Sequence, residues 1–182
     1  MDPTLTLIFS ILLIVTPAYA ANGMALIFGG GKPLDGGRKF FDGRRLLGDG
    51  KTVKGTCSGL IFGFIAALTV GLTYLSLSAD STLALPGYIA IGFCSAVGAI
   101  GGDLLGSFVK RRMGLPPGSP APFIDQFDFI LMALLLTFLV NQALHLLDFN
   151  FILVVSVLVF TPFAHLIGNY IVYRAGRKKH PW

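Results

Sequence analysis

Five long uncharged stretches constrain the fold of this chain more than any other feature. They are Thr4–Phe28, Gly55–Ala79, Ser81–Gly102, Phe129–Leu147 and Phe149–Tyr173. A helix that crosses the hydrocarbon core of a bilayer needs about 20 apolar residues, so each stretch is long enough to span. Only 13% of the residues are charged, about half the share of an average soluble domain. We therefore predict an all-α integral membrane protein with five transmembrane helices.

The distribution of basic residues predicts how these helices are oriented. The spans are expected at about 4–28, 55–78, 86–109, 125–147 and 150–173, with longer loops at 29–54 and 110–124. All 14 Lys and Arg residues lie in 32–54, 110–112 and 174–179, whereas the opposite loops hold Asp2, Asp80 and Asp148. Because basic residues concentrate on the cytoplasmic side, we predict an outside N-terminus, a cytoplasmic C-terminus and two functional cytoplasmic loops. Residues 1–182 then form a single multi-pass domain of the cell membrane.

The first stretch has an alternative interpretation as a secretory signal peptide. Pro17–Ala20 resembles a cleavage site that follows an apolar region. However, Met1, Asp2 and Pro3 provide no positive segment, and cleavage after Ala20 leaves four spans with the basic loops on the wrong side. We therefore favour a membrane span.

Polar residues gather where the third stretch ends and the fourth begins. Asp103, Ser107 and Lys110 share one face of a helix, and Asp125 and Asp128 share another. Carboxylates, a hydroxyl group and cations at a membrane edge predict a divalent metal and a phosphorylated substrate. The alternatives are a solvated Asp103 near the interface and an Asp125 that interacts only with a helix dipole. Three acidic residues together favour the metal site.

The loop at 29–54 is rich in glycine and carries seven cations. Its three Asp-Gly pairs, at 35–36, 42–43 and 49–50, offer turns where backbone N–H groups approach an anion. A solvated basic linker is the alternative. Gly48–Thr52 resembles the end of a P-loop, but Arg45 occupies the position of the required first glycine, which excludes a P-loop NTPase. The mixture of aspartates and glycines favours a small anionic ligand, and we expect no nucleic-acid partner.

Two motifs resemble a known enzyme group. Gly102–Arg112, followed by Pro122–Asp128, is similar to the signature of cytidylyltransferases that make CDP-diacylglycerol. Pro17–Asn22, Pro33–Gly37 and the Asp-Gly motifs of the first loop resemble the archaeal branch, the CDP-archaeol synthases. The resemblance covers essentially the whole chain. One departure is Pro120–Ile124, which stands where the bacterial pattern has His-Gly-Gly, and the glycine-rich loop is the candidate to close over the nucleotide instead.

The resemblance implies transfer of CMP from CTP to an unsaturated archaetidic acid (2,3-bis-O-geranylgeranylglycerol 1-phosphate), with release of pyrophosphate and a requirement for Mg²⁺. Its partners are then CTP, the isoprenoid ether-lipid phosphate and membrane lipids; the oligomeric state stays open. The active site is expected on the cytoplasmic side, with the isoprenoid chains in a groove between helices.

The same resemblance assigns roles to individual residues. The expected metal ligands are Asp103, Asp125 and Asp128. The expected catalytic residues are Asp103, Ser107, Lys110, Arg111, Asp125 and Asp128. The expected substrate-binding residues are Asn22, Asp35, Arg38, Asp42, Arg44, Arg45, Lys51, Thr52, Lys54 and Arg112.

The sequence also has two alternative functional interpretations. A CDP-alcohol phosphotransferase requires Asp-Gly-x2-Ala-Arg and then Gly-x3-Asp-x3-Asp, and Asp42–Arg45 lacks the downstream part. A cation channel or carrier requires a charged path across the bilayer, whereas the ionisable groups of this chain cluster on one face. The sequence therefore favours the cytidylyltransferase.

Overall fold

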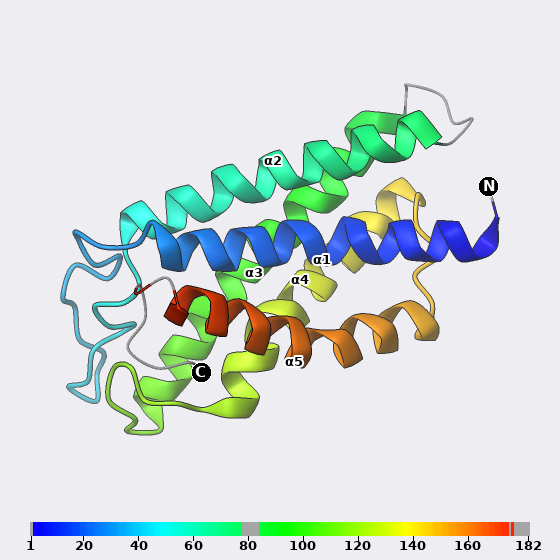
Figure 1. Cartoon of the computed structure of the whole chain (residues 1–182). Helices are drawn as coiled ribbons and strands as arrows, with labels where there is room; N and C mark the ends of the chain where they lie inside the picture. Colours follow the sequence, from blue (N-terminus) through cyan, green and yellow to red (C-terminus); the bar gives the residue numbers. More distant parts are fainter. Residues whose placement is uncertain (1, 78–83, 175, 177–182) are drawn as a thin grey trace.

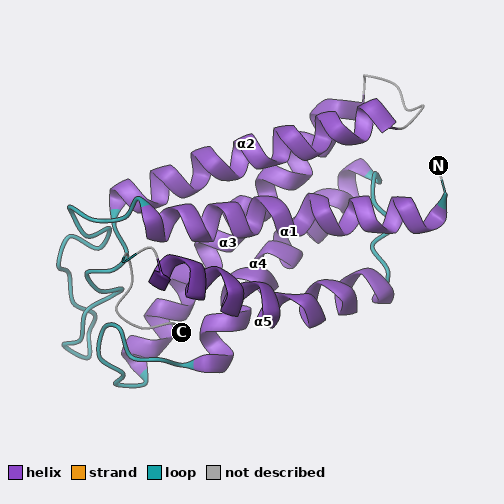
Figure 2. Ribbon diagram, viewed as in Figure 1, coloured by secondary structure: helices purple, strands orange, loops and turns teal. Residues whose placement is uncertain are grey.

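Five α-helices make up the core of the protein, as the computed structural model shows; it describes residues 2–77, 84–174 and 176. The helices are α1 (Pro3–Ile27), α2 (Val53–Leu77), α3 (Leu85–Arg112), α4 (Pro122–Leu144) and α5 (Phe151–Arg174). They lie side by side in one bundle (Figure 1), and no strand is drawn among the described residues (Figure 2). All five are long and apolar enough to cross a membrane. The predicted all-helical membrane class is therefore confirmed.

The boundaries of α3 and α4 differ from the prediction. α3 continues to Arg112, so the basic cluster at 110–112 forms the last helical turn instead of a loop. Cations are favourable there because the carbonyl end of a helix carries partial negative charge. α4 begins at Pro122, since proline fits the first helical position, and the loop between the two helices shortens to 113–121. Residue 78 and the basic tail at 177–179 lie outside the described residues.

Small residues let the first four helices approach one another closely. A Cβ atom on Gly59 would lie 2.6 Å from the Ala21 carbonyl oxygen of α1, and one on Gly63 would lie 2.4 Å from Ala96 Cβ of α3. On the other side of α3, a Cβ atom on Gly98 would lie 2.6 Å from Ala133 Cα of α4. Small-residue faces of this kind allow close packing of helices in a membrane. The contact at Gly98 also fixes the relative positions of α3 and α4, which carry Asp103, Asp125 and Asp128.

The two long connections lie at one end of the bundle, opposite the N-terminal end of α1 (Figure 1). One joins α1 to α2 and the other joins α3 to α4. The basic last turn of α3 reaches the same end. Polar groups from distant parts of the sequence are thereby brought together.

Candidate active site

The glycine-rich loop is organised around Asp35. The Asp35 side chain is only 1% exposed. It accepts hydrogen bonds from Arg45 Nη2 (2.7 Å) and Nε (3.2 Å), and from the backbone N–H groups of Gly37, Leu47 and Gly48 (3.0–3.2 Å). Arg45 and these backbone groups hold the pKa of Asp35 far below its ordinary value, and Asp35, followed by Asp49, raises the pKa of Arg45. The loop is therefore a folded unit with a charged centre, which argues against a solvated linker.

Replacing Asp35 with asparagine is expected to open this loop. The amide would place N–H donors against N–H donors and would leave Arg45 without its main partner, at a cost of about 3 kcal/mol. Trypsin should then cleave the loop about 10²-fold faster. Asp49→Asn is the matched control, because Asp49 contacts the same arginine but its side chain is 73% exposed. Equal cleavage rates for both variants would contradict the structural role of Asp35.

The expected pH dependence follows from the direction of the Asp35 shift. A carboxyl group whose pKa is lower in the folded state stabilises the fold above its unfolded value of about 4 and loses that effect only as the pH falls toward the folded pKa. The loop should therefore resist trypsin equally across the neutral range. A marked rise in cleavage between pH 8 and pH 6 would contradict this expectation.

Two arginines fasten the loop to the end of α3. Arg44 Nη1 donates to the carbonyl oxygen of Arg112 (2.7 Å) and, at 3.3 Å, to that of Arg111. Arg112 donates to Asp42 Oδ1 (3.0 Å) and to the Arg45 carbonyl oxygen (2.6 Å). Arg44, Asp42 and Arg112 were predicted to bind substrate, but in this structure their side chains join the loop to α3.

Two aromatic rings also contact Arg112 where the loop meets α3, and the sequence did not identify them as part of this contact. The Arg112 guanidinium lies 4.9 Å from the ring centroids of both Phe40 and Phe108, a distance at which a cation and a ring attract each other. The signal in the sequence was Phe40-Phe41, an aromatic pair within a polar loop.

Thr52 positions Lys51 at the start of α2. Thr52 is buried, and its hydroxyl oxygen accepts hydrogen bonds from the N–H groups of Gly30 and Gly55 (both 3.1 Å). It therefore caps the first turn of α2. The neighbouring Lys51 Nζ contacts both carboxylate oxygens of Asp103 on α3, at 2.6 and 2.5 Å. Two residues that are 52 positions apart thus meet as one ion pair.

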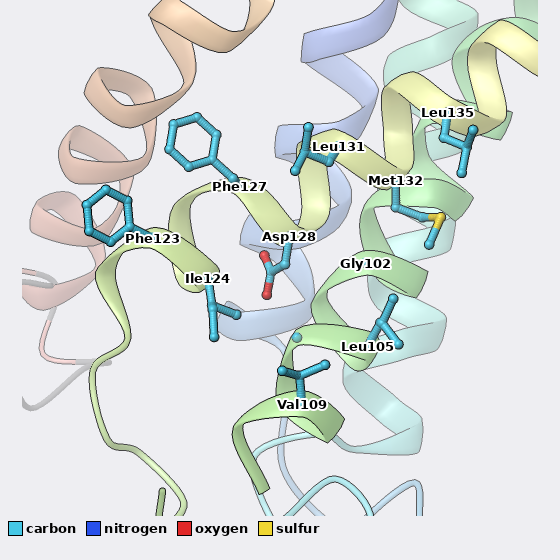
Figure 3. Close-up of a pocket in the computed structure, with 11 residues that line it drawn as sticks. Gly102, Leu105, Val109, Phe123, Ile124, Phe127, Asp128, Leu131, Met132 and Leu135 are labelled. Atoms are coloured by element: carbon cyan, nitrogen blue, oxygen red, sulfur yellow. The ribbon is translucent and has the colours of Figure 1, made fainter. Parts of the chain in front are cut away.

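The two acidic residues of α4 have different surroundings. Asp125 pairs with Lys110 and accepts a hydrogen bond from the Ala121 N–H (2.8 Å), which closes the turn between α3 and α4. Asp128 points from α4 toward α3 (Figure 3), and a Cβ atom on Gly106 would lie 2.0 Å from its Oδ2. Asp128 forms no ion pair with a described residue, although it interacts electrostatically with Asp103 and nearby lysines. The charges of Asp103 and Asp128 therefore interact, whereas Asp125 is paired with Lys110.

A largely apolar groove extends from Asp128 between α3 and α4 (Figure 3). Its volume is about 560 Å³. Asp128 is the one charged residue among those that line it. The other lining residues are Gly102, Leu105, Gly106, Val109, Phe123, Ile124, Phe127, Leu131, Met132 and Leu135. Such a groove suits a long apolar chain attached to a polar head.

Several predicted residues retain groups that are free to bind a ligand. Arg111 is only 6% exposed, and its buried Nε has no hydrogen-bond partner in the described part of the chain. Its Nη1 would lie 3.8 Å from a Cβ atom on Gly48, which places the guanidinium beside the glycine-rich loop. Arg38 and Lys54 are exposed and form no ion pair with described residues. Their predicted roles in substrate binding, and the predicted catalytic role of Arg111, stay predictions.

The side chains of Asn22 and Ser107 lie on the helices. Ser107 is buried on α3, and Asn22 is half-buried on α1. The structure shows no hydrogen bond from either side chain to another described residue. Their predicted roles in substrate binding and catalysis stay predictions.

The predicted metal ligands carry the type of donor that Mg²⁺ prefers. Within the described ranges there is no group of three His, Cys, Asp or Glu side chains that could hold a metal ion. Mg²⁺ is commonly bound by one or two carboxylates together with substrate phosphates and water. Asp103, Asp125 and Asp128 all carry hard oxygen donors of that kind, and their roles as ligands stay predictions.

Comparisons with known proteins agree with this arrangement. A family model described as "CarS-like: CDP-archaeol synthase" matches residues 4–182. The CDP-archaeol synthase of Methanococcoides burtonii is 42% identical over 91% of this chain and 99% of its own length, and that of Methanocaldococcus jannaschii is 38% identical over 97% and 98%. A solved structure of an intramembrane enzyme for archaeal membrane lipids biosynthesis is 35% identical, with a TM-score of 0.72 over 87% of this chain and 91% of that one. The chain therefore belongs to the CarS-like family of CDP-archaeol synthases.

Proposed function

We propose that this chain transfers CMP from CTP to an unsaturated archaetidic acid, forming CDP-archaeol and pyrophosphate. The observation that carries the proposal is its family membership, with about 40% identity to CDP-archaeol synthases over nearly the whole chain. The arrangement of cations, carboxylates and an apolar groove at one end of the bundle supports it. The substrates require such a combination, because one is a triphosphate and the other carries two isoprenoid chains.

The site is proposed to face the cytoplasm, where CTP is available. Support comes from the clustering of basic residues at the loop end of the bundle, since positive loops stay on the cytoplasmic side. The N-terminal end of α1 then lies outside the cell membrane. The groove between α3 and α4 accommodates the isoprenoid chains, and the lipid phosphate lies near Asp128.

The reaction is proposed to proceed by in-line displacement. A lipid phosphate oxygen forms a bond to the α-phosphorus of CTP, and the bond from that phosphorus to the bridging oxygen breaks as pyrophosphate leaves. The attacking phosphate is already anionic near pH 7, so no strong general base is required. Catalysis then depends on positioning the two phosphates and neutralising their charge.

Individual residues supply those two effects. Arg111, Arg38 and Lys54 contribute positive charge toward the triphosphate, and the folded loop covers the nucleotide. Asp103 and Asp128 would hold Mg²⁺, which when bound would neutralise charge on the triphosphate and align it. Asp35 and Arg45 act indirectly, by keeping the loop folded.

An assay with the purified full-length chain tests the proposal. With CTP, Mg²⁺ and the ether-lipid phosphate, we expect CDP-lipid and pyrophosphate in equal amounts, and no product after EDTA treatment. Omitting the lipid is the control, and an ester-linked phosphatidic acid measures selectivity for the linkage. Hydrolysis of CTP without CDP-lipid, or consumption of an added CDP-lipid by an alcohol acceptor, would contradict the proposed reaction.

A further inference from the structure

The ammonium group of Lys51 lies beside the carboxylate of Asp103. Lys51 Nζ contacts both carboxylate oxygens of Asp103, at 2.6 and 2.5 Å. Both side chains are about three-quarters buried, with exposures of 26% and 23%. Because water screens a partly buried ion pair only weakly, the Lys51 ammonium group competes effectively with other cations for the Asp103 oxygens.

The backbone around Lys51 holds it in place. The Leu34 N–H donates to the Lys51 carbonyl oxygen (2.7 Å), and the Lys51 N–H donates to that of Gly48 (3.2 Å). The next residue, Thr52, is anchored by two further hydrogen bonds. The backbone of Lys51 is therefore fixed in place. Its flexible four-carbon chain still allows the ammonium group to move.

Mg²⁺ cannot share the position that the ammonium group holds. The ion needs oxygen ligands at about 2.0–2.1 Å, and two positive charges on the same two oxygens repel each other strongly. Metal binding at Asp103 therefore requires that Lys51 move away. The phosphates of a nucleotide are acceptors that an ammonium group can bind instead.

We propose that Lys51 is an internal counter-cation of Asp103, so that the metal binds tightly only together with the nucleotide, whose phosphates take over the lysine. The inference rests on the proposed function, because it assumes a CTP and metal site at Asp103. It assigns Lys51 two partners in succession, the carboxylate before substrate binding and the triphosphate after it. Because coupling between two ligands is reciprocal, CTP strengthens metal binding by the factor by which the metal strengthens CTP binding.

Mn²⁺ binding to the full-length chain in detergent tests this role without turnover. The free ion is measured by electron paramagnetic resonance, with and without CTP, in the absence of lipid. Lys51→Met should bind Mn²⁺ about 10-fold more tightly than the unchanged protein when CTP is absent, since the competing charge is gone. The strengthening of Mn²⁺ binding by CTP should shrink in the same variant.

Three variants control for other causes. Lys39→Met removes an equal charge from an exposed position of the same loop, where the side chain forms no ion pair with a described residue, and should leave Mn²⁺ affinity close to that of the unchanged protein. Lys51→Arg keeps the charge and should keep Mn²⁺ binding weak. The double variant Lys51→Met, Asp103→Asn should lose the tighter Mn²⁺ binding of Lys51→Met. That loss would show that the additional Mn²⁺ affinity depends on Asp103.

The outcomes separate this inference from the proposed function. If the unchanged protein makes CDP-lipid and binds Mn²⁺ with CTP, but Lys51→Met binds Mn²⁺ no more tightly alone, the counter-cation role is wrong and the enzymatic function stands. A gain of equal size in Lys39→Met would also overturn it, because the effect would then be one of net charge. If the unchanged protein neither binds Mn²⁺ with CTP nor makes CDP-lipid, both proposals fail.

Discussion

Replacement of Asp128 with asparagine is expected to abolish CDP-lipid formation while leaving the bundle at least as stable. Asp128 is the one charged residue that lines an otherwise apolar groove, it interacts electrostatically with Asp103, and it forms no ion pair with a described residue. A carboxylate in such surroundings costs about 2.5–3.5 kcal/mol on insertion scales, which a neutral amide of the same shape avoids. Under the proposed mechanism Asp128 would hold the Mg²⁺ that binds the reacting phosphates, so its loss should lower the rate about 10³-fold.

Two measurements on purified protein check this combination. The rate of CDP-lipid formation gives the catalytic effect, and thermal loss of helical circular dichroism gives the stability. Asp148→Asn is the control, since Asp148 is exposed in the connection between α4 and α5, and that connection lies at the opposite end of the bundle from the two long loops (Figure 1). Near-normal activity in Asp128→Asn would remove Asp128 from the metal site. Lost activity together with a lower melting temperature would instead indicate a structural role for the carboxylate.

The helical fold could be predicted from the sequence because membrane insertion depends on local composition. About 20 uncharged residues in a row are sufficient to form a span, whatever they contact. The ends of the helices were harder to predict. The basic cluster was assigned to a loop, yet α3 continues through Lys110 to Arg112 because positive side chains stabilise the carbonyl end of a helix.

The partners of individual charged residues could not be predicted from sequence. Asp35, Arg44 and Arg112 had the residue types expected of a phosphate site, but they hold the glycine-rich loop together and fasten it to α3. Arg111, adjacent to Arg112 and of the same type, forms no ion pair with a described residue, whereas Arg112 pairs with Asp42. Such differences depend on which groups meet in three dimensions, and spacing along the chain carries no information about contacts 50 to 70 residues apart.

Gly106 was not recognised as a site residue, yet its lack of a side chain determines where Asp128 can lie. A Cβ atom at Gly106 would lie 2.0 Å from Asp128 Oδ2 and 2.8 Å from Cγ. Asp128 Cβ would also lie 2.9 Å away, so Gly106→Ala must displace the carboxylate and shift the start of the Asp128 side chain by a smaller amount. A shift of about 1 Å in a positioned group costs about 10²-fold in rate. We therefore expect Gly106→Ala to form CDP-lipid about 10²-fold more slowly, with a small change in melting temperature.

Two other glycines of α3 make this prediction specific. A Cβ atom at Gly102 would lie 2.2 Å from the Asp128 carbonyl oxygen, so Gly102→Ala should push α4 away and destabilise the bundle by about 1–3 kcal/mol. A Cβ atom at Gly101 would meet nothing within 4 Å, and Gly101→Ala should retain activity and gain up to about 1 kcal/mol from helix propensity. Rates of CDP-lipid formation and melting temperatures for the three variants distinguish the cases. Full activity in Gly106→Ala would show that the position of Asp128 against α3 is unimportant for the reaction, because the carboxylate cannot keep that position beside an added methyl group.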